Sequence, residues 1–256
     1  MEVVYGALNS GSNGNAYIIA AAGSAILVDA GLPLATMEKR IEKLGLHLSM
    51  VKALFISHEH GDHVTGLAGA SRKYGMPVYL SRGTYNALPA GLKPAQPYWL
   101  EAHQSIPIGP FTITSFPKQH DGAEPYSFIV TTGSFTLGVF TDIGEPCTAL
   151  QQYLGRCQAL FLEANYCEHL LAQSKYPAFL KQRISGAQGH LSNQQALQLL
   201  QQYRGTQLAH VVLAHLSANN NTHTRALEAF APISGSVKVE VASRYGVCGP
   251  FKALAG

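Results

Sequence analysis

The spacing of apolar residues along the chain predicts alternating strands and helices. Short runs rich in apolar and β-branched residues predict strands, and apolar positions three or four residues apart predict helices. Pro33 starts one such helix and Gly45 ends it, and the apolar run at 51–57 predicts a buried strand. The other predicted strands lie at 2–8, 16–22, 25–29, 78–80, 111–116, 126–132, 135–141, 159–163, 210–214 and 237–242, and the other helices lie near 64–74, 147–154, 193–203 and 222–230.

This order of elements predicts an α/β fold. Two halves, each opened by strands and continued by alternating strands and helices, predict a four-layer αββα sandwich with two mixed sheets flanked by helices. A chain of 256 residues can bury a large core, and no Pro- or Gly-rich linker divides it. We therefore expect a single domain over residues 1–256.

Charge and composition narrow the function only a little. A net charge of +3 and a pI near 8.6 permit a polyanionic partner without requiring one. The N-terminal residues resemble neither a charged leader with an apolar segment nor a membrane span, so we expect a cytoplasmic protein with no membrane partner. The four cysteines lack Cys-x-x-Cys spacing, which predicts reduced thiols. The sequence leaves protein partners undetermined.

The segment His58-Glu59-His60-Gly61-Asp62-His63, directly after the predicted buried strand, is the strongest chemical signal. Imidazole and carboxylate groups are ligands that suit divalent zinc, manganese or iron. The loop at the C-terminal end of a strand is also where sites gather in α/β proteins. An exposed polar loop is the alternative, but three histidines and an aspartate within six residues make it the weaker one.

Three more polar residues follow predicted strands: His120, Asp142 and His215. Taken singly, they could be a turn residue, a helix N-cap and a half-buried histidine bonded to backbone. Taken together with the histidine-rich segment, they supply enough side chains to hold a pair of metal ions.

These residues resemble the pattern of the metallo-β-lactamase superfamily, and the resemblance covers nearly the whole chain. An Asp29-Ala30-Gly31 turn precedes the His-x-His-x-Asp-His motif, and a His, an Asp and a final His follow in the superfamily's order. Within the superfamily, the chain looks most similar to the YycJ-like (WalJ) bacterial proteins, which are related to tRNase Z type phosphodiesterases. It departs from that branch at Gly61, where Ser is common, and at Tyr166, where many relatives have His.

The resemblance implies a dinuclear metal site. It assigns one divalent ion, zinc or manganese, to His58, His60 and His120. It assigns the other to Asp62, His63 and His215, with Asp142 bridging the two. It also implies that a metal-bridging hydroxide is the nucleophile and that an anionic phosphodiester is the substrate class. Two divalent ions and two aspartates give the site a net charge of about +2, which attracts such an anion.

The resemblance also gives His190 and Glu163 a role. His190-Leu191-Ser192 matches the His-x-(Ser/Thr) motif of tRNase Z, and Glu163 stands where a glutamate orients that histidine. We expect His190 to protonate the leaving oxygen, with Asp62 as a further catalytic residue. The alternative for His190 is a histidine near a helix start that bonds only to backbone. Ser192 and Gln195 predict a capping box for that helix.

Two pairs of residues are candidates for substrate binding. Ser12 and Asn13 lie in a Gly/Ser/Asn loop that could turn backbone N–H groups to a phosphate, although a tight strand connection is also open. Lys181 and Arg183 could follow a nucleic-acid backbone, or could simply lie on a solvated helix face.

The sequence therefore favours a dinuclear metal-dependent phosphodiesterase. The preferred substrate is nucleic acid, with DNA ahead of RNA, and the YycJ-like branch implies a 5′ to 3′ DNA exonuclease. One alternative enzyme hydrolyses small phosphodiesters, thioesters or lactones, since the same metal cage supports attack on a carbonyl carbon. A catalytically inactive binder of nucleic acid or protein is the alternative outside the enzymes.

Overall fold

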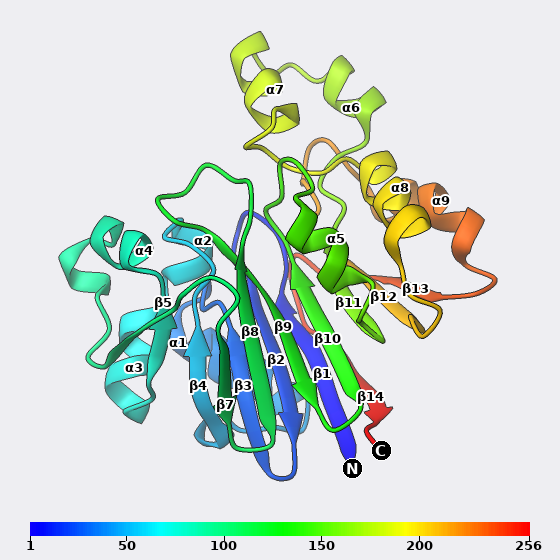
Figure 1. Ribbon diagram of the computed structural model, residues 1–256. Helices are drawn as coiled ribbons and strands as arrows, with labels where there is room; N and C mark the ends of the chain where they lie inside the picture. Colours follow the sequence, from blue (N-terminus) through cyan, green and yellow to red (C-terminus); the bar gives the residue numbers. More distant parts are fainter. The chain divides into compact units, whose positions relative to one another are not determined.

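The computed structural model describes residues 1–256 and divides them into two compact units. Unit 1 comprises Met1–Pro117, Gly122–Phe135 and Ser243–Gly256, and unit 2 comprises Lys118–Asp121 and Thr136–Ala242. Each unit is built from strands and helices (Figure 1). The single domain expected from the sequence stays a prediction.

Unit 1 contains a mixed seven-stranded sheet in the order β14-β1-β2-β3-β4-β5-β6. The first four of these strands pair antiparallel, and the pairs from β3 to β6 are parallel. The strands are β1 (Glu2–Asn9), β2 (Ala16–Ala21), β3 (Ser24–Val28), β4 (Val51–Phe55), β5 (Val78–Leu80), β6 (Pro97–Trp99) and β14 (Cys248–Leu254).

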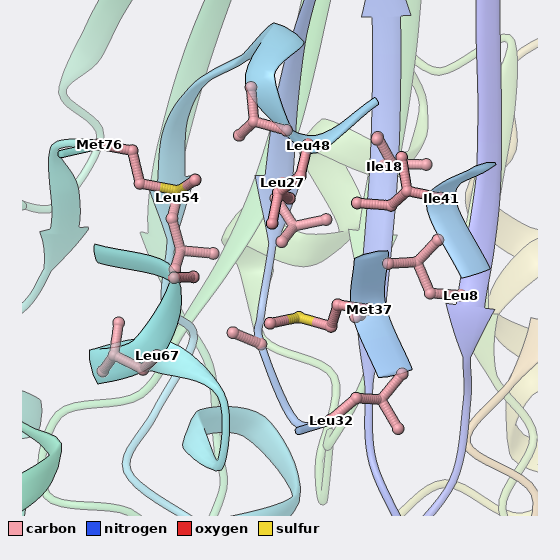
Figure 2. Packing of buried hydrophobic residues seen from close by; sticks show 14 of the residues in the cluster. Leu8, Ile18, Leu27, Leu32, Met37, Ile41, Leu48, Leu54, Leu67 and Met76 are labelled. Atoms are coloured by element: carbon pink, nitrogen blue, oxygen red, sulfur yellow. The ribbon is translucent and has the colours of Figure 1, made fainter. Parts of the chain in front are cut away.

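Helix α1 (Leu34–Lys43) packs its apolar face against this sheet (Figure 2). Met37 and Ile41 of α1 are fully buried in one cluster with Leu27 and Ile18 of the strands. Burying each such side chain contributes about 1.5–3 kcal/mol, so this cluster anchors the strands from which the site loops leave. The other helices of the unit are α2 (Gly61–Val64), α3 (Leu67–Tyr74), α4 (Arg82–Ala87), η1 (Leu48–Met50) and η2 (Ala90–Leu92).

The helix predicted near 64–74 is wrong as one continuous element. The structure has α2 and α3, with Thr65 and Gly66 between them. Gly66 donates its N–H to the Ala30 carbonyl at 2.8 Å, and a Cβ at this position would overlap the Leu32 carbonyl oxygen. The chain breaks here because this close approach to the loop after β3 is open only to glycine.

Unit 1 also contains the antiparallel strands β7 (Ser105–Ile108), β8 (Phe111–Pro117) and β9 (Tyr126–Thr132). Unit 2 is built on parallel strands, in the order β13-β12-β11-β10. These strands are β10 (Phe135–Phe140), β11 (Ala159–Glu163), β12 (His210–Ala214) and β13 (Lys238–Val241). The helices of unit 2 are α5 (Thr148–Leu154), α6 (Glu168–Gln173), α7 (Ala178–Ser185), α8 (Asn193–Tyr203), α9 (His223–Phe230) and η3 (Ala231–Ile233).

The observed elements confirm the predicted α/β class with two mixed sheets flanked by helices. Every predicted strand is present within one or two residues. The sequence interpretation did not identify β6, β7, β14, α4, α6 and α7. No helix is long and apolar enough to span a membrane.

Candidate metal centre

The predicted metal ligands occur in both units. His58, His60, Asp62 and His63 belong to unit 1, and His120, Asp142 and His215 belong to unit 2. Of those in unit 1, His58 and His60 lie on the loop after β4, and Asp62 and His63 lie in α2, which follows directly; this segment is called the ligand loop.

Three imidazole rings of unit 1 lie against one another. The ring centroid of His58 is 4.5 Å from that of His60 and 4.1 Å from that of His63. His58 Nε2 is 3.0 Å from His60 Nδ1, and both His58 and His63 are fully buried. The loop thus brings several imidazole nitrogens close together, the type of donor that a divalent cation binds.

The buried carboxylate of Asp29 orients this cluster through hydrogen bonds. Asp29 accepts hydrogen bonds from the backbone N–H of Ser57 at 2.8 Å and from the Ser57 hydroxyl at 2.9 Å. Its Oδ2 also lies 2.7 Å from Nδ1 of His63. Because Asp29 only accepts, Nδ1 of His63 carries the proton and Nε2 keeps its lone pair. Asp29 therefore supports the ligand loop by hydrogen bonds.

Asn15 is a site residue that the sequence interpretation missed. Its amide nitrogen is 3.1 Å from Asp62 Oδ2 and 3.1 Å from His63 Nε2. Its backbone N–H also donates to the Asp62 carbonyl at 2.7 Å. Asn15 thus positions two predicted ligands, and its place at the end of the Gly/Ser/Asn loop was the only sign in the sequence.

Gly31 brings the loop after β3 into direct contact with the ligand loop. Its N–H donates to the Asn15 carbonyl at 2.8 Å, and a Cβ here would overlap the Asp62 carbonyl oxygen. A larger residue would displace Asp62, which explains why glycine is needed after Asp29 and Ala30.

In unit 2, the ends of parallel strands bring four side chains together. Asp142 follows β10, Glu163 ends β11 and His215 follows β12, while His190 comes from the loop before α8. Parallel strands end at the same edge of a sheet, so residues that follow them meet there. The potential ligand atoms of these four residues all lie within 4.8 Å of one another.

The backbone at two of these positions is strained. Asp142 has φ +57° and His215 has φ +54°, in the left-handed region that favours glycine, and Asp29 of unit 1 has φ +61°. Each such residue costs on the order of 1–3 kcal/mol and persists only where its surroundings hold it. Strain at three strand ends, two of which carry predicted metal ligands, is typical of a functional centre.

In unit 2, a hydrogen-bond acceptor beside Nδ1 fixes the tautomer of each predicted ligand histidine. His120 Nδ1 lies 3.0 Å from the Gly189 carbonyl, and His215 Nδ1 lies 3.1 Å from Glu163 Oε1. Both partners only accept, and the Asn165 amide nitrogen, 3.2 Å from His215 Nδ1, has a shorter bond to the His215 carbonyl at 2.8 Å, so the proton is on Nδ1 and the lone pair is on Nε2. His215 Nε2 is 3.5 Å and His120 Nε2 is 3.9 Å from Oδ1 of the buried Asp142. Burial lowers the pKa of His120 to about 4 despite the opposing charge of Asp142, so its imidazole is neutral at pH 7.

This donor set fits divalent metal ions. Ligating histidines in proteins donate their second ring N–H to a carboxylate or carbonyl, as His63, His120 and His215 do here. Neutral imidazoles beside buried carboxylates suit zinc or manganese. The assignment of individual ligands to two ions stays a prediction.

Glu163 accepts several hydrogen bonds among the site residues of unit 2. Its Oε1 lies 2.8 Å from His190 Nδ1, and its Oε2 accepts the backbone N–H groups of Ile143 at 2.7 Å and Leu191 at 3.1 Å. Full burial alone would raise the pKa of this carboxyl, but the charge and hydrogen bond of His190, with the bond of His215, lower it to about 2. An ionised Glu163 holds the Nδ1–H tautomer of His190.

His190 is placed by a rigid turn. The predicted capping box of α8 is present: Ser192 Oγ accepts from Gln195 N–H at 3.1 Å, and Gln195 Oε1 accepts from Ser192 N–H at 2.9 Å. His190 bonds to the side chain of Glu163, and its own side chain is 21% exposed. The alternative in which His190 bonds only to backbone is therefore wrong.

The candidate substrate-binding residues differ in their surroundings. Asn13 donates its amide to the Arg244 carbonyl at 2.7 Å, while Ser12 is exposed. The N–H groups of Gly11 and Gly14 bond within the same loop, to Asn15 Oδ1 and the Gly11 carbonyl. These bonds favour the tight strand connection over a phosphate-binding loop.

The two cations of α7 also have partners within unit 2. Lys181 Nζ donates to the Ala172 carbonyl at 2.6 Å, which ties α7 to the end of α6. Arg183 pairs with Asp121, with Nε at 2.8 Å and Nη2 at 2.6 Å from Oδ2. Arg183 also lines a small pocket of about 60 Å³ with His190.

Comparison with known proteins decides the family. Residues 24–216 match the family model described as a beta-lactamase superfamily domain. The chain belongs to the metallo-β-lactamase superfamily. The matched residues include all the predicted metal ligands and His190. The prediction that the protein is a hydrolase of this superfamily is thereby confirmed.

Relatives of this metallo-β-lactamase superfamily member include nucleases. It is 30% identical over 224 residues to exodeoxyribonuclease YycJ of Bacillus anthracis, covering 86% of this chain and 85% of the relative. The fold is similar to that of YhfI from Bacillus subtilis (TM-score 0.72, 16% identity, 99% and 100% of the two chains). It is also similar to the short form of human tRNase Z (TM-score 0.65, 16% identity, 98% and 100% of the two chains).

Proposed function

We propose that this protein is a two-metal phosphodiesterase that removes nucleotides from DNA, as an exonuclease acting from the 5′ end. The observation that carries the proposal is the 2.8 Å contact between His190 and the buried Glu163, beside Asp142 and His215. The name exodeoxyribonuclease on a relative that spans most of the chain supports the same substrate class.

The proposed ligands are those implied by the superfamily pattern. His58, His60 and His120 would hold one divalent ion, Asp62, His63 and His215 the other, and Asp142 would bridge. When bound, the two ions would supply Lewis acidity toward a phosphodiester and lower the pKa of water to near neutrality. Zinc and manganese both suit this donor set.

The residues of the chain then supply orientation and a proton. Because Glu163 binds Nδ1–H of His190, the proton that His190 gives to the leaving oxygen comes from Nε2. Glu163 stays ionised and stabilises the charged imidazolium before the transfer. Asn15 holds the Asp62 carboxylate in place. Asp62 and Glu163 are therefore both positioned before substrate arrives.

The His190–Glu163 pair favours phosphodiesters over thioesters. An alkoxide of a nucleotide leaves poorly and gains greatly from a proton donor, whereas a thiolate leaves without one. The buried, ionised Glu163 carboxylate binds His190, His215 and two backbone N–H groups. A thioesterase, whose reaction needs no general acid, would have no use for a histidine oriented in this way. Such a histidine is equally unexpected in a protein that only binds nucleic acid.

A panel of polymers tests this function. Metal-stripped protein is reloaded with manganese or zinc and given 5′-labelled single- and double-stranded DNA and RNA. We expect labelled mononucleotide or short products from DNA. Cleavage of RNA alone would contradict the substrate, and no cleavage of any polymer would contradict the nuclease proposal.

A further inference from the structure

We infer that one face of α7, formed by Phe179 and Arg183, is a DNA-strand platform: Phe179 stacks on a base while Arg183 holds a phosphate beside His190. This inference rests on the proposed nuclease function and names residues that bind its substrate.

Helix α7 is unusually exposed for a helix that carries a large aromatic residue. None of its eight residues is buried, and Phe179 is 72% exposed. Figure 1 shows α6 and α7 as a pair on the link between β11 and α8, and the Lys181 bond to the Ala172 carbonyl fastens them together. Phe179 therefore presents its ring to solvent from a held helix.

Phe179 and Arg183 share a face of α7, because residues four positions apart on a helix are neighbours, roughly 5–6 Å between Cβ atoms. The Arg183 side chain is 62% exposed, and Asp121 takes its Nε and Nη2 groups. A guanidinium has five N–H donors, so the Nη1 group can meet a phosphate while Asp121 fixes the plane.

The pocket beside Arg183 connects this face of α7 with His190, the proposed proton donor. Its lining includes Arg183, Asp121 and His190, and Asp121 follows the predicted ligand His120 directly. A phosphate held by Arg183 would therefore lie beside the proposed proton donor. A nucleotide has a base on one side of its sugar and a phosphate on the other, and this face offers an aromatic ring for the first and a guanidinium for the second.

The chemistry of this face favours a nucleic-acid strand. Every base offers a π-face, so a single exposed ring binds strands of any sequence, and a nearby cation adds affinity for the backbone. A second copy of the chain could also cover Phe179, and the experiment below separates that outcome.

Direct binding tests the platform without turnover. Fluorescence anisotropy of a 5′-labelled single-stranded DNA is followed in EDTA for the wild type, Phe179→Ala, Phe179→Tyr and Arg183→Ala. Leu227→Ala, which removes another exposed apolar side chain on a helix of unit 2, is the control. Circular dichroism confirms that each variant is folded.

We expect Phe179→Ala to weaken binding on the order of ten-fold, with Phe179→Tyr and Leu227→Ala close to wild type. Arg183→Ala should lower the slope of log Kd against log salt by about 1, and Phe179→Ala should leave that slope unchanged.

Wild-type binding by Phe179→Ala would overturn the inference, and a shift of its oligomeric state in size-exclusion chromatography would assign the ring to a dimer contact instead. If the metal-loaded wild type cleaves DNA in either case, the proposed function stands without the platform. Absence of both binding and cleavage by the wild type would remove the function and the platform together.

Discussion

At the scale of single residues, the His190–Glu163 pair makes a prediction about leaving groups. His190→Ala should slow hydrolysis of a DNA phosphodiester by about 10²–10⁴-fold, because the sugar alkoxide needs the proton. Bis(p-nitrophenyl) phosphate should lose much less, since p-nitrophenolate leaves without protonation. Steady-state kinetics on both substrates, with metal content checked, measures the difference. Equal losses on the two substrates would show that His190 is not the acid.

Glu163 also links stability to pH. Its pKa in the folded protein, about 2, lies below the ordinary value of 4.5, so the unfolded chain binds the proton more readily. The stabilisation is complete above about pH 5 and is lost as the pH falls through 4.5 toward 2. Urea unfolding of metal-free protein at about pH 6 and about pH 3.5 should show a smaller pH effect in Glu163→Gln than in the wild type. The same effect in both would mean that Glu163 is not the group that titrates.

Of two glycines near the ligand loop, only one should be sensitive to replacement by alanine. Gly31→Ala should lower the unfolding free energy by about 1–3 kcal/mol and reduce metal content, because the new methyl group overlaps the Asp62 carbonyl. Gly61→Ala is the matched control, since a Cβ there meets no atom within 4 Å. Calorimetry and metal analysis of both proteins measure the effect. A normal metal content in Gly31→Ala would contradict this packing account.

At the scale of elements, the sequence predicted strands best where they are buried. The strands β2, β4, β11 and β12 are nearly all apolar, so their patterns are unambiguous. Strand β14 was missed because its residues are only partly buried and Pro250 interrupts the pattern. Its pairing with β1, at the other end of the chain, is a contact that no local pattern reveals.

The helix α8 makes a prediction at the same scale, because its capping box holds the turn that carries His190. Ser192→Ala should lower the unfolding free energy by about 0.5–2 kcal/mol, since the hydroxyl that accepts the Gln195 N–H and donates to the Glu168 carboxylate is lost. Gln194→Ala, at an exposed position of the same turn, should change it little. Urea denaturation curves give both values, and equal stability of the two variants would show that the cap contributes nothing.

At the scale of the whole molecule, the sequence predicts titratable residues for the candidate site but does not reveal most of the residues that hydrogen-bond to them. The spacing His-x-His-x-Asp-His is rare enough to recognise, and strand ends point to Asp142 and His215. Asn15, Ser57 and Gly189 act through hydrogen bonds to those residues. Such partners are set by three-dimensional packing, and apart from the place of Asn15 at the end of the Gly/Ser/Asn loop their local sequence does not mark them.

The most direct test of the two-metal nuclease is a metal titration that follows binding and cleavage together. Manganese or zinc is added to metal-free protein, bound metal is measured, and degradation of 5′-labelled DNA is recorded at each step. Asp142→Asn is the matched variant, because asparagine tolerates the left-handed backbone at this position while removing the carboxylate. The proposal predicts two bound ions per chain, cleavage that rises with the second, and loss of that second ion and of cleavage in Asp142→Asn. Full cleavage with one ion, or none with two, would contradict it.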